Sequence, residues 1–306
     1  MRWHEVISKF FGIIFLLALV LGFLLPGVFL PLSGITMYVL GVIITLSFLT
    51  LDYGEFFKTI KQFYIPLAVF VIYKLLLPAG LYFLFSLWQR NIGLAVLLLA
   101  ATPVGMITPA LAQITGGDRS FVLALVIITA FTAPFYLPLL LQLVGGAYIE
   151  LNALSMMFSL SKLIFIPFAV SLVLRRFVSG FIKKTAPAHG ALSVMLLVFV
   201  LLGIAAQGSA YIRENPAVSL SFLGASFVLA AVLAVLGYFG FRFLGRERRL
   251  GLTVAVTYMN LALAITLAAK YFTPDVMLFC IMYEVPGNLL PVVLRRLGRG
   301  KRKQML

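Results

Sequence analysis

Residues 93–109 read GLAVLLLAATPVGMITP, an apolar run that is interrupted at Pro103 and Pro109. A second run, GLTVAVTYMN at 251–260, opens in the same way and is broken around Asn260. A broken helix inside a bilayer leaves backbone groups unpaired, which is tolerated only where they face protein, water or a ligand. Matching breaks in the two halves of a chain point to the binding site of a transporter. The pair of runs therefore predicts a membrane transporter.

The composition places the chain in a membrane. Of its 306 residues, 63% are hydrophobic and 11% are charged, a balance that water-soluble globular proteins do not have. A span needs about 20 mainly apolar residues, and ten segments are suitable: 7–25, 33–50, 64–87, 91–115, 119–143, 153–174, 190–210, 217–241, 249–271 and 275–294. No small-residue cleavage site follows the first segment, so we interpret it as a span and not as a signal peptide. Almost nothing remains outside the bilayer for a catalytic domain, and we expect no enzyme.

The net charge of +15 follows the positive-inside rule and does not require nucleic acid as a partner. Of the 24 Lys and Arg residues, Lys74 and Lys162 lie deep in spans, and Arg90, Arg213 and Lys270 fall on one side of the membrane. The remaining nineteen fall on the side of the amino terminus. This distribution predicts an even number of spans and both termini in the cytoplasm. We expect the membrane to be the cytoplasmic membrane of a bacterial or archaeal cell. The basic carboxyl tail is expected to contact anionic lipid headgroups.

The ten segments divide into two halves of five, residues 1–148 and 149–306. An odd number of spans in each half would insert the halves upside down relative to each other, and the fourth span of each half is the interrupted one. The next span of each half also ends with prolines, at Pro134 and Pro138 and at Pro286 and Pro291. The alternative is that these prolines and glycines reflect only their general frequency in membrane helices.

Three stretches carry a resemblance to the bile acid:sodium symporter superfamily: residues 101–118, Ala133-Pro134, and 259–264, which read MNLALA. The resemblance implies an all-α membrane fold of ten helices in two inverted five-helix repeats, with the fourth and ninth helices broken and crossing near the midplane. It further implies a core domain made of spans 3–5 and 8–10 and a panel domain made of spans 1–2 and 6–7. An organic anion would bind between the two domains and cross by alternating access.

The resemblance does not extend to the side chains that bind sodium in the family. Residue by residue, those positions fall on Tyr73, Thr108, Pro109, Val122, Val126, Ala255 and Met259, with Asn260 alone retained. Sodium requires several oxygen donors, as hard cations do, and most of these side chains supply none. Sodium coupling is therefore doubtful, although backbone carbonyls at the two breaks could still act as ligands.

Lys74 lies near the middle of the third span, next to Tyr73. Placing a Lys at mid-membrane costs about 2.5 to 3.5 kcal/mol on insertion scales, which makes it a functional candidate by default. Its ammonium group could stand where sodium would bind, and it could exchange a proton during transport, so that sodium or a proton is the candidate coupling ion. The alternative is a Lys that extends along its stem to the interface.

Glu284 is the only carboxylate deep in a predicted span, and we consider two roles for it. It could pair with Lys74, or it could be a neutral acid hydrogen-bonded to backbone that Pro286 frees. Lys162, in the sixth span, could attract an anion into the cavity, extend outward, or pair with Glu150. Gln113, Thr108 and Asn260 could bind the substrate or the loose backbone, and for Thr108 we favour the backbone.

The sequence contains no cluster of metal ligands, since His4 and His189 lie in terminal or loop segments and Cys280 stands alone. No cofactor is expected. An arsenite-type exporter is a weaker alternative, because such exporters resemble one another in a Cys where this chain has Thr102. An intramembrane enzyme or sensor is weaker still. The predicted transport site comprises Tyr73, Lys74, Thr108, Pro109, Gln113, Lys162, Met259, Asn260 and Glu284, and its expected partners are a small organic anion and the bilayer.

Overall fold

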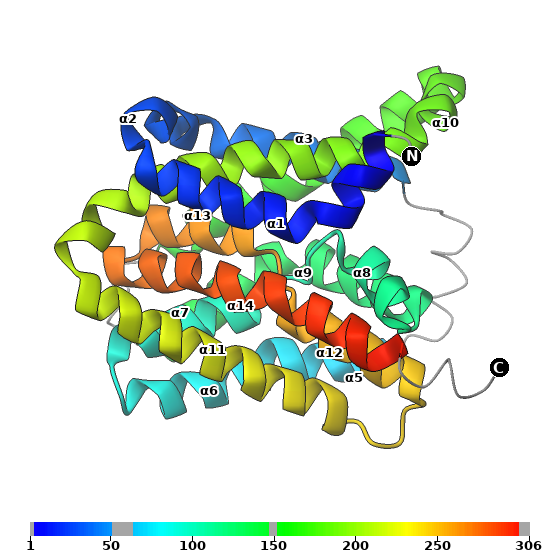
Figure 1. The fold of residues 1–306 in the computed structure, drawn as a ribbon. Helices are drawn as coiled ribbons and strands as arrows, with labels where there is room; N and C mark the ends of the chain where they lie inside the picture. The colour runs from blue at the N-terminus through cyan, green and yellow to red at the C-terminus, as the bar shows by residue number, and fades with distance from the viewer. Residues whose placement is uncertain (1–2, 51–63, 147–151, 300–306) are drawn as a thin grey trace.

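The computed structural model describes residues 3–50, 64–146 and 152–299, and within these ranges the protein is helical, without strands (Figure 1). The elements of the amino-terminal part are α1 (Trp3–Leu24), α2 (Pro26–Phe29), the 3-10 helix η1 (Leu30–Ile35), α3 (Thr36–Thr50), α5 (Tyr64–Phe70), the π-helix η2 (Val71–Leu76), α6 (Leu77–Ser86), α7 (Arg90–Ala101), α8 (Thr108–Thr115) and α9 (Arg119–Gly145). They are followed by α10 (Ala153–Glu214), α11 (Pro216–Phe239), α12 (Arg246–Thr257), α13 (Leu261–Tyr271) and α14 (Pro274–Arg299).

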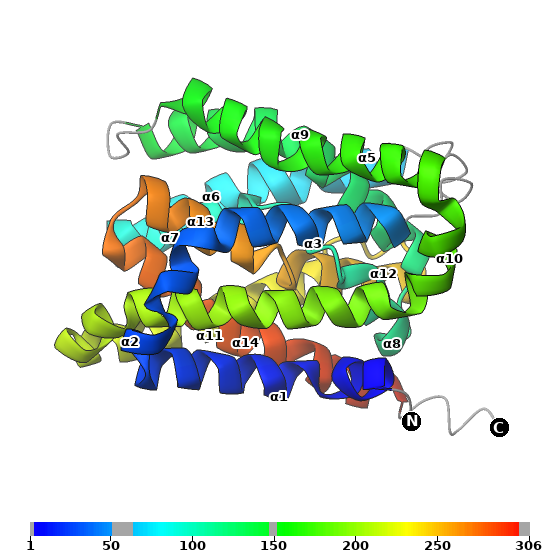
Figure 2. The same ribbon diagram turned by 90° about the horizontal axis from the view of Figure 1, so that it is seen from above.

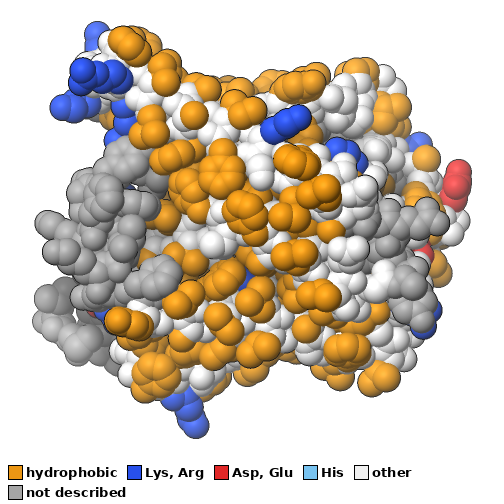
Figure 3. Space-filling model, turned by 180° about the vertical axis from the view of Figure 1, so that it is seen from behind, with side chains coloured by type: hydrophobic (Ala, Val, Ile, Leu, Met, Phe, Trp, Pro, Cys, Tyr) orange, Lys and Arg blue, Asp and Glu red, His pale blue; other side chains and the backbone are white. Residues whose placement is uncertain are grey.

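Five helical segments of the described chain are long and apolar enough to cross a membrane: Pro26–Thr50, Tyr64–Ser86, Arg119–Gly145, Ala153–Glu214 and Pro216–Phe239. Their outer surfaces carry large exposed hydrophobic side chains, and Figure 3 shows such side chains spread over one whole face, with Lys and Arg mainly near its edges. An apolar surface of this extent is suited to lipid and not to water. The protein is thus an integral membrane protein.

The segment that separates the sixth and seventh predicted spans is helical, whereas His189 of this segment was predicted to lie in a loop. α10 runs through it and changes direction near Val178, the one residue inside the helix with non-helical dihedral angles (φ −129°, ψ 34°). Figure 2 shows the two arms of α10 running in opposite directions from this bend. Pro187 lies within this helix, and a Pro is compatible with a helix wherever the lost hydrogen bond is tolerated.

Two short apolar helices, α7 and α13, are also among the most buried. In α7 every residue from Ile92 to Ala101 is buried, as is most of α13. A helix that is apolar on all sides is stable only when it is surrounded by other apolar elements. The two broken helices therefore form the centre of the protein, and α1, α3 and α10 lie along one side of it (Figure 1).

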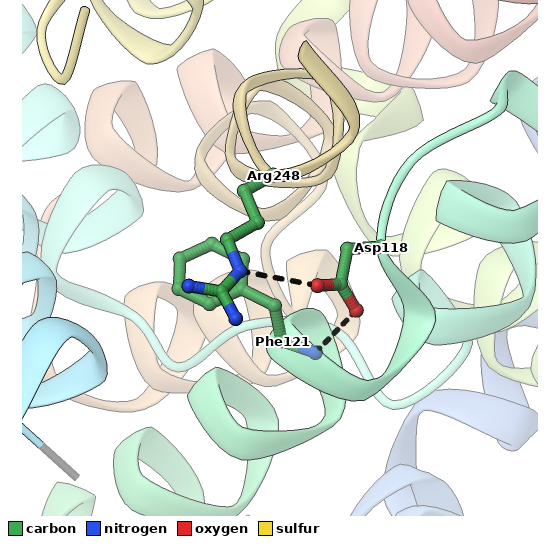
Figure 4. Close-up of polar contacts among 3 residues, drawn as sticks. All are labelled: Asp118, Phe121 and Arg248. Atoms are coloured by element: carbon green, nitrogen blue, oxygen red, sulfur yellow. Dashed lines mark hydrogen bonds and ion pairs between the residues drawn. The ribbon is translucent and has the colours of Figure 1, made fainter. Parts of the chain in front are cut away.

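A close approach between two glycines fixes the turn before α9 against α12. A Cβ atom on Gly117 would lie 2.7 Å from the backbone nitrogen of Gly251, so a side chain does not fit there without a shift. The adjacent Asp118 caps α9 by accepting from the Phe121 N–H at 3.0 Å, and it pairs with Arg248 of α12 at 3.3 Å (Figure 4). These contacts join the first half of the chain to the second.

Candidate functional site

Both predicted breaks are present, and they cross each other. α7 ends at Ala101 and α8 begins at Thr108, while α12 ends at Thr257 and α13 begins at Leu261. Between them, Val104 and Met259 form an antiparallel bridge.

Two backbone hydrogen bonds hold the crossing. The Asn260 N–H donates to the Pro103 carbonyl at 2.8 Å, and the Gly105 N–H donates to the Tyr258 carbonyl at 3.2 Å. The breaks thus satisfy part of each other's freed backbone, which is what a bilayer interior requires of irregular segments.

Side chains satisfy further backbone groups at the crossing. The Thr108 hydroxyl donates to the Tyr258 carbonyl at 3.0 Å, and the Thr129 hydroxyl accepts from the Val104 N–H at 3.1 Å. Asn260 caps α13 by accepting from the Leu263 N–H at 3.2 Å. The preference for backbone bonding at Thr108 agrees with this geometry.

The side chain of Lys74, a residue of η2, reaches the carboxyl end of α7. It is 2% exposed, and its Nζ donates to the carbonyls of Ala100 at 3.0 Å and Thr102 at 2.7 Å. The intervening carbonyl of Ala101 accepts from the Tyr136 hydroxyl at 2.6 Å. Because the carboxyl end of a helix carries partial negative charge, an ammonium group is favourable there. Lys74 does not extend to the interface.

The backbone around Lys74 is itself unusual. Residues Val71–Leu76 form a π-helix within an otherwise α-helical span, and π-helical turns in membrane and soluble proteins often accompany functional sites. The neighbouring Tyr73 faces another direction, because its hydroxyl donates to the Leu236 carbonyl of α11 at 2.5 Å. The widened turn therefore presents two successive polar side chains to two different helices.

Lys74 and Glu284 do not form an ion pair in this structure. Among the described residues, the ion pair within 4 Å joins Arg248 and Asp118. The Glu284 carboxylate accepts instead from Asn288 Nδ2, at 2.8 Å to Oε2. Asn288 also accepts from the Tyr258 hydroxyl at 3.3 Å. Glu284 is thereby connected to the residue at the end of α12.

A cavity of about 370 Å³ opens beside the crossing. Its wall is formed by α3, the two breaks, α8, the first part of α9, α10 beyond its bend, α13 and α14. The lining is mostly apolar, and its polar side chains are Ser47, Thr50, Gln113, Arg119, His189, Ser193, Asn260 and Glu284, together with the hydroxyl-bearing Tyr258. A mainly apolar pocket with a few convergent polar groups is the usual form of a small-molecule site.

The predicted site residues divide between this cavity and its surroundings. Those that line the cavity are Pro109, Gln113, Met259, Asn260 and Glu284, and those that do not are Tyr73, Lys74, Thr108 and Lys162. Lys162 is exposed on α10, and the alternative partner Glu150 lies outside the described residues.

Arg119 and His189 line the cavity but were absent from the predicted site. Arg119 is exposed and directly follows the Gly117-Asp118 turn. Its closeness in sequence to the first break could have indicated that it belongs to the site. His189 was assigned to a loop, whereas it is 6% exposed on α10 and its Nε2 lies 3.0 Å from the Thr185 hydroxyl. Nothing in the local sequence indicates that the bend of α10 brings this ring to the cavity.

A family model described as Sodium Bile acid symporter family matches residues 37–215, which is more than half of the chain. The chain belongs to the sodium bile acid symporter family. Members of this family are membrane transporters, and this protein is a transporter of that type. No curated protein matches the chain.

Several positions that the resemblance aligned with sodium ligands carry apolar or aromatic side chains that are buried in this structure. Tyr73, Val122, Val126 and Ala255 are buried in one apolar cluster, and the nearby carbonyls of Ala100 and Thr102 accept from Lys74. A hard cation needs several oxygen ligands, and apolar side chains provide none.

Proposed function

We propose that this protein is a secondary carrier of a small organic anion that works by alternating access, in which the Lys74 ammonium group replaces a bound sodium ion. The observation that carries this proposal is the pair of hydrogen bonds from Lys74 Nζ to the Ala100 and Thr102 carbonyls at the end of the broken helix α7. An ammonium group that belongs to the chain itself can stabilise the break without a sodium gradient.

The proposed architecture has ten spans in two inverted repeats, with the arms of α10 counted as two spans and each broken pair as one. The core domain would contain α5 to α9 and α11 to α14, and the panel domain would contain α1 to α3 and α10. The cavity lies between elements assigned to the two domains, since it is lined by α3 and α10 on one side and by the crossing and α8 on the other. This is where an alternating-access carrier would hold its substrate.

The guanidinium group of Arg119 favours an anion near the rim of the cavity. Arg119 is exposed there, and His189 lies on the opposing helix α10. Both residues are near the end of the protein that the charge distribution predicts to be cytoplasmic. Thr102 donates its hydroxyl to the Leu98 carbonyl and offers no soft ligand, so arsenite is not part of this proposal.

At the end of the protein opposite the predicted cytoplasmic end, contacts between helices support a cavity that is closed on that side. Tyr211 of α10 donates to one carboxylate oxygen of Asp275, at the start of α14, and Asn91 of α7 donates to the other oxygen at 2.6 Å. These three residues join a proposed panel helix to two proposed core helices. Alternating access would require this contact to open when the cavity closes.

The test is uptake into proteoliposomes of three labelled anions of different size, pyruvate, benzoate and taurocholate. Sodium and pH gradients are imposed separately on wild type, Lys74→Ala and the control Lys183→Ala, which removes an exposed Lys from α10. The proposal expects uptake of at least one anion without sodium, a loss of more than tenfold in Lys74→Ala, and wild-type uptake in Lys183→Ala. Uptake that requires sodium would overturn the replacement of sodium by Lys74 and favour backbone carbonyl ligands.

A further inference from the structure

Glu284 is the only acidic residue among the described residues that line the cavity. It is 4% exposed, and no described Lys or Arg lies within ion-pair distance of it. One carboxylate oxygen, Oε2, accepts from Asn288 Nδ2, and no described residue donates to Oε1. The carboxyl group therefore has one oxygen without a protein partner in the wall of the proposed substrate site.

A carboxylate and a bound anion in the same cavity repel each other, and the repulsion is strong because the surrounding medium is largely apolar. A proton on Glu284 removes this repulsion and gives the carboxyl group an O–H donor that an anion can accept from. Binding of the anion and binding of the proton must then favour one another to the same extent, by linkage.

We propose that Glu284 takes up one proton when the cavity binds its anion, so that this carrier transports an organic anion together with a proton. The inference rests on the proposed function for the anion and adds the coupling ion and its site. The proton comes from water on the side to which the cavity is open, forms the O–H bond at Oε1, and returns to water on the other side when the anion leaves.

Hydrogen bonds connect Glu284 to the point where the two broken helices of the proposed core domain meet. Its Oε2 contacts Asn288, and the Asn288 Oδ1 accepts from the Tyr258 hydroxyl at 3.3 Å. The backbone carbonyl of Tyr258 accepts from Gly105 and Thr108 at the crossing. A change in the charge of Glu284 thus affects the hydrogen bonds of Asn288 and, through it, of Tyr258, which lies where the two broken helices meet.

Other ionisable groups near Glu284 must be separated from it in any pH experiment. The Tyr258 hydroxyl and the Cys280 thiol are its titratable neighbours, and across the cavity the groups are Arg119 of α9 and His189 of α10. Described residues of α3, α8 and α13 contribute no charged side chain to the lining. His189 is the neighbour whose ordinary titration overlaps the physiological range, so its substitution is the necessary control.

The test uses the full-length protein in proteoliposomes with a trapped pH-sensitive dye, and the panel anion that wild type takes up fastest. Wild type, Glu284→Gln and His189→Gln are compared in two assays, namely net uptake driven by an acidic exterior and exchange of labelled for unlabelled anion at equal pH. Because Gln is neutral like the protonated acid, Glu284→Gln should retain exchange. It should lose the acceleration by the pH gradient and the proton movement that accompanies uptake, whereas His189→Gln should keep both.

Equilibrium binding of the same anion to purified protein at pH 5.5 and 7.5 makes the test independent of turnover. Full coupling to one proton weakens wild-type binding by up to roughly tenfold for each pH unit, and binding to Glu284→Gln should vary less than twofold. Proton movement or pH-dependent binding that persists in Glu284→Gln would overturn the inference. So would wild-type uptake without proton movement, or uptake driven by sodium. If wild type transports none of the panel anions, the proposed function itself fails, which is a distinct outcome.

Discussion

The substitution Lys74→Met removes the ammonium group while keeping an unbranched side chain of similar length. It leaves the carbonyls of Ala100 and Thr102 buried without their donor. A hydrogen bond from a charged group contributes about 1.5 to 3 kcal/mol, so two such bonds correspond to roughly 3 to 6 kcal/mol. Relief of the cost of burying the ammonium group offsets about 2.5 to 3.5 kcal/mol of that sum. From the midpoints of these two ranges we expect the free energy of unfolding to fall by about 1.5 kcal/mol.

The assay is reversible unfolding of purified protein in lipid bicelles, followed by helical circular dichroism. Lys183→Met is the matched control, because Lys183 is exposed on α10, and its unfolding free energy should remain within about 0.5 kcal/mol of wild type. If Lys74→Met were as stable as wild type or more stable, the ammonium group would not be holding the break, and the central argument would be refuted.

Three further substitutions test contacts that hold the two broken helices in place. Gly117→Ala should lower the unfolding free energy by about 1 to 3 kcal/mol through overpacking against Gly251, and an unchanged melting curve would show that the turn before α9 is not in contact with α12. Tyr136→Phe removes the donor to the Ala101 carbonyl and should cost about 1 to 3 kcal/mol in the same measurement; no loss would mean that another group satisfies this carbonyl. Asp275→Asn should weaken the contact between α10 and α14 and increase labelling of cysteines introduced at that end by a membrane-impermeant thiol reagent, whereas labelling equal to that of the parent would contradict a closing role.

The sequence was sufficient to predict features that local chemistry determines. Pro103 removes a backbone donor and cannot continue α7, and the residue before a Pro avoids helical dihedral angles, so the first break could be located from the sequence. Asn260 is a strong amino-terminal cap, and it caps α13 in the structure. The helical membrane class and the family were also correct, because uniform apolar segments and the stretches near both breaks carry those signals.

Long-range contacts and the path of α10 were not predictable in the same way. The burial of Lys74 followed from its depth, but its bonds to Ala100 and Thr102 depend on how two spans pack, and periodicity within one span holds no such information. The pairing of Lys74 with Glu284 was one of two roles considered for Glu284, and in the structure each group has other partners. His189 was assigned to a loop, and it lines the cavity because α10 stays helical through that segment.

The most direct test of the account is the initial rate of anion uptake by wild type and Lys74→Ala, measured with and without an inward sodium gradient at fixed pH. We predict that sodium leaves the wild-type rate unchanged and that Lys74→Ala loses more than tenfold in both conditions. A wild-type rate that rises severalfold with sodium, or Lys74→Ala uptake equal to that of wild type, would contradict the claim that the Lys74 ammonium group stands in place of the bound cation.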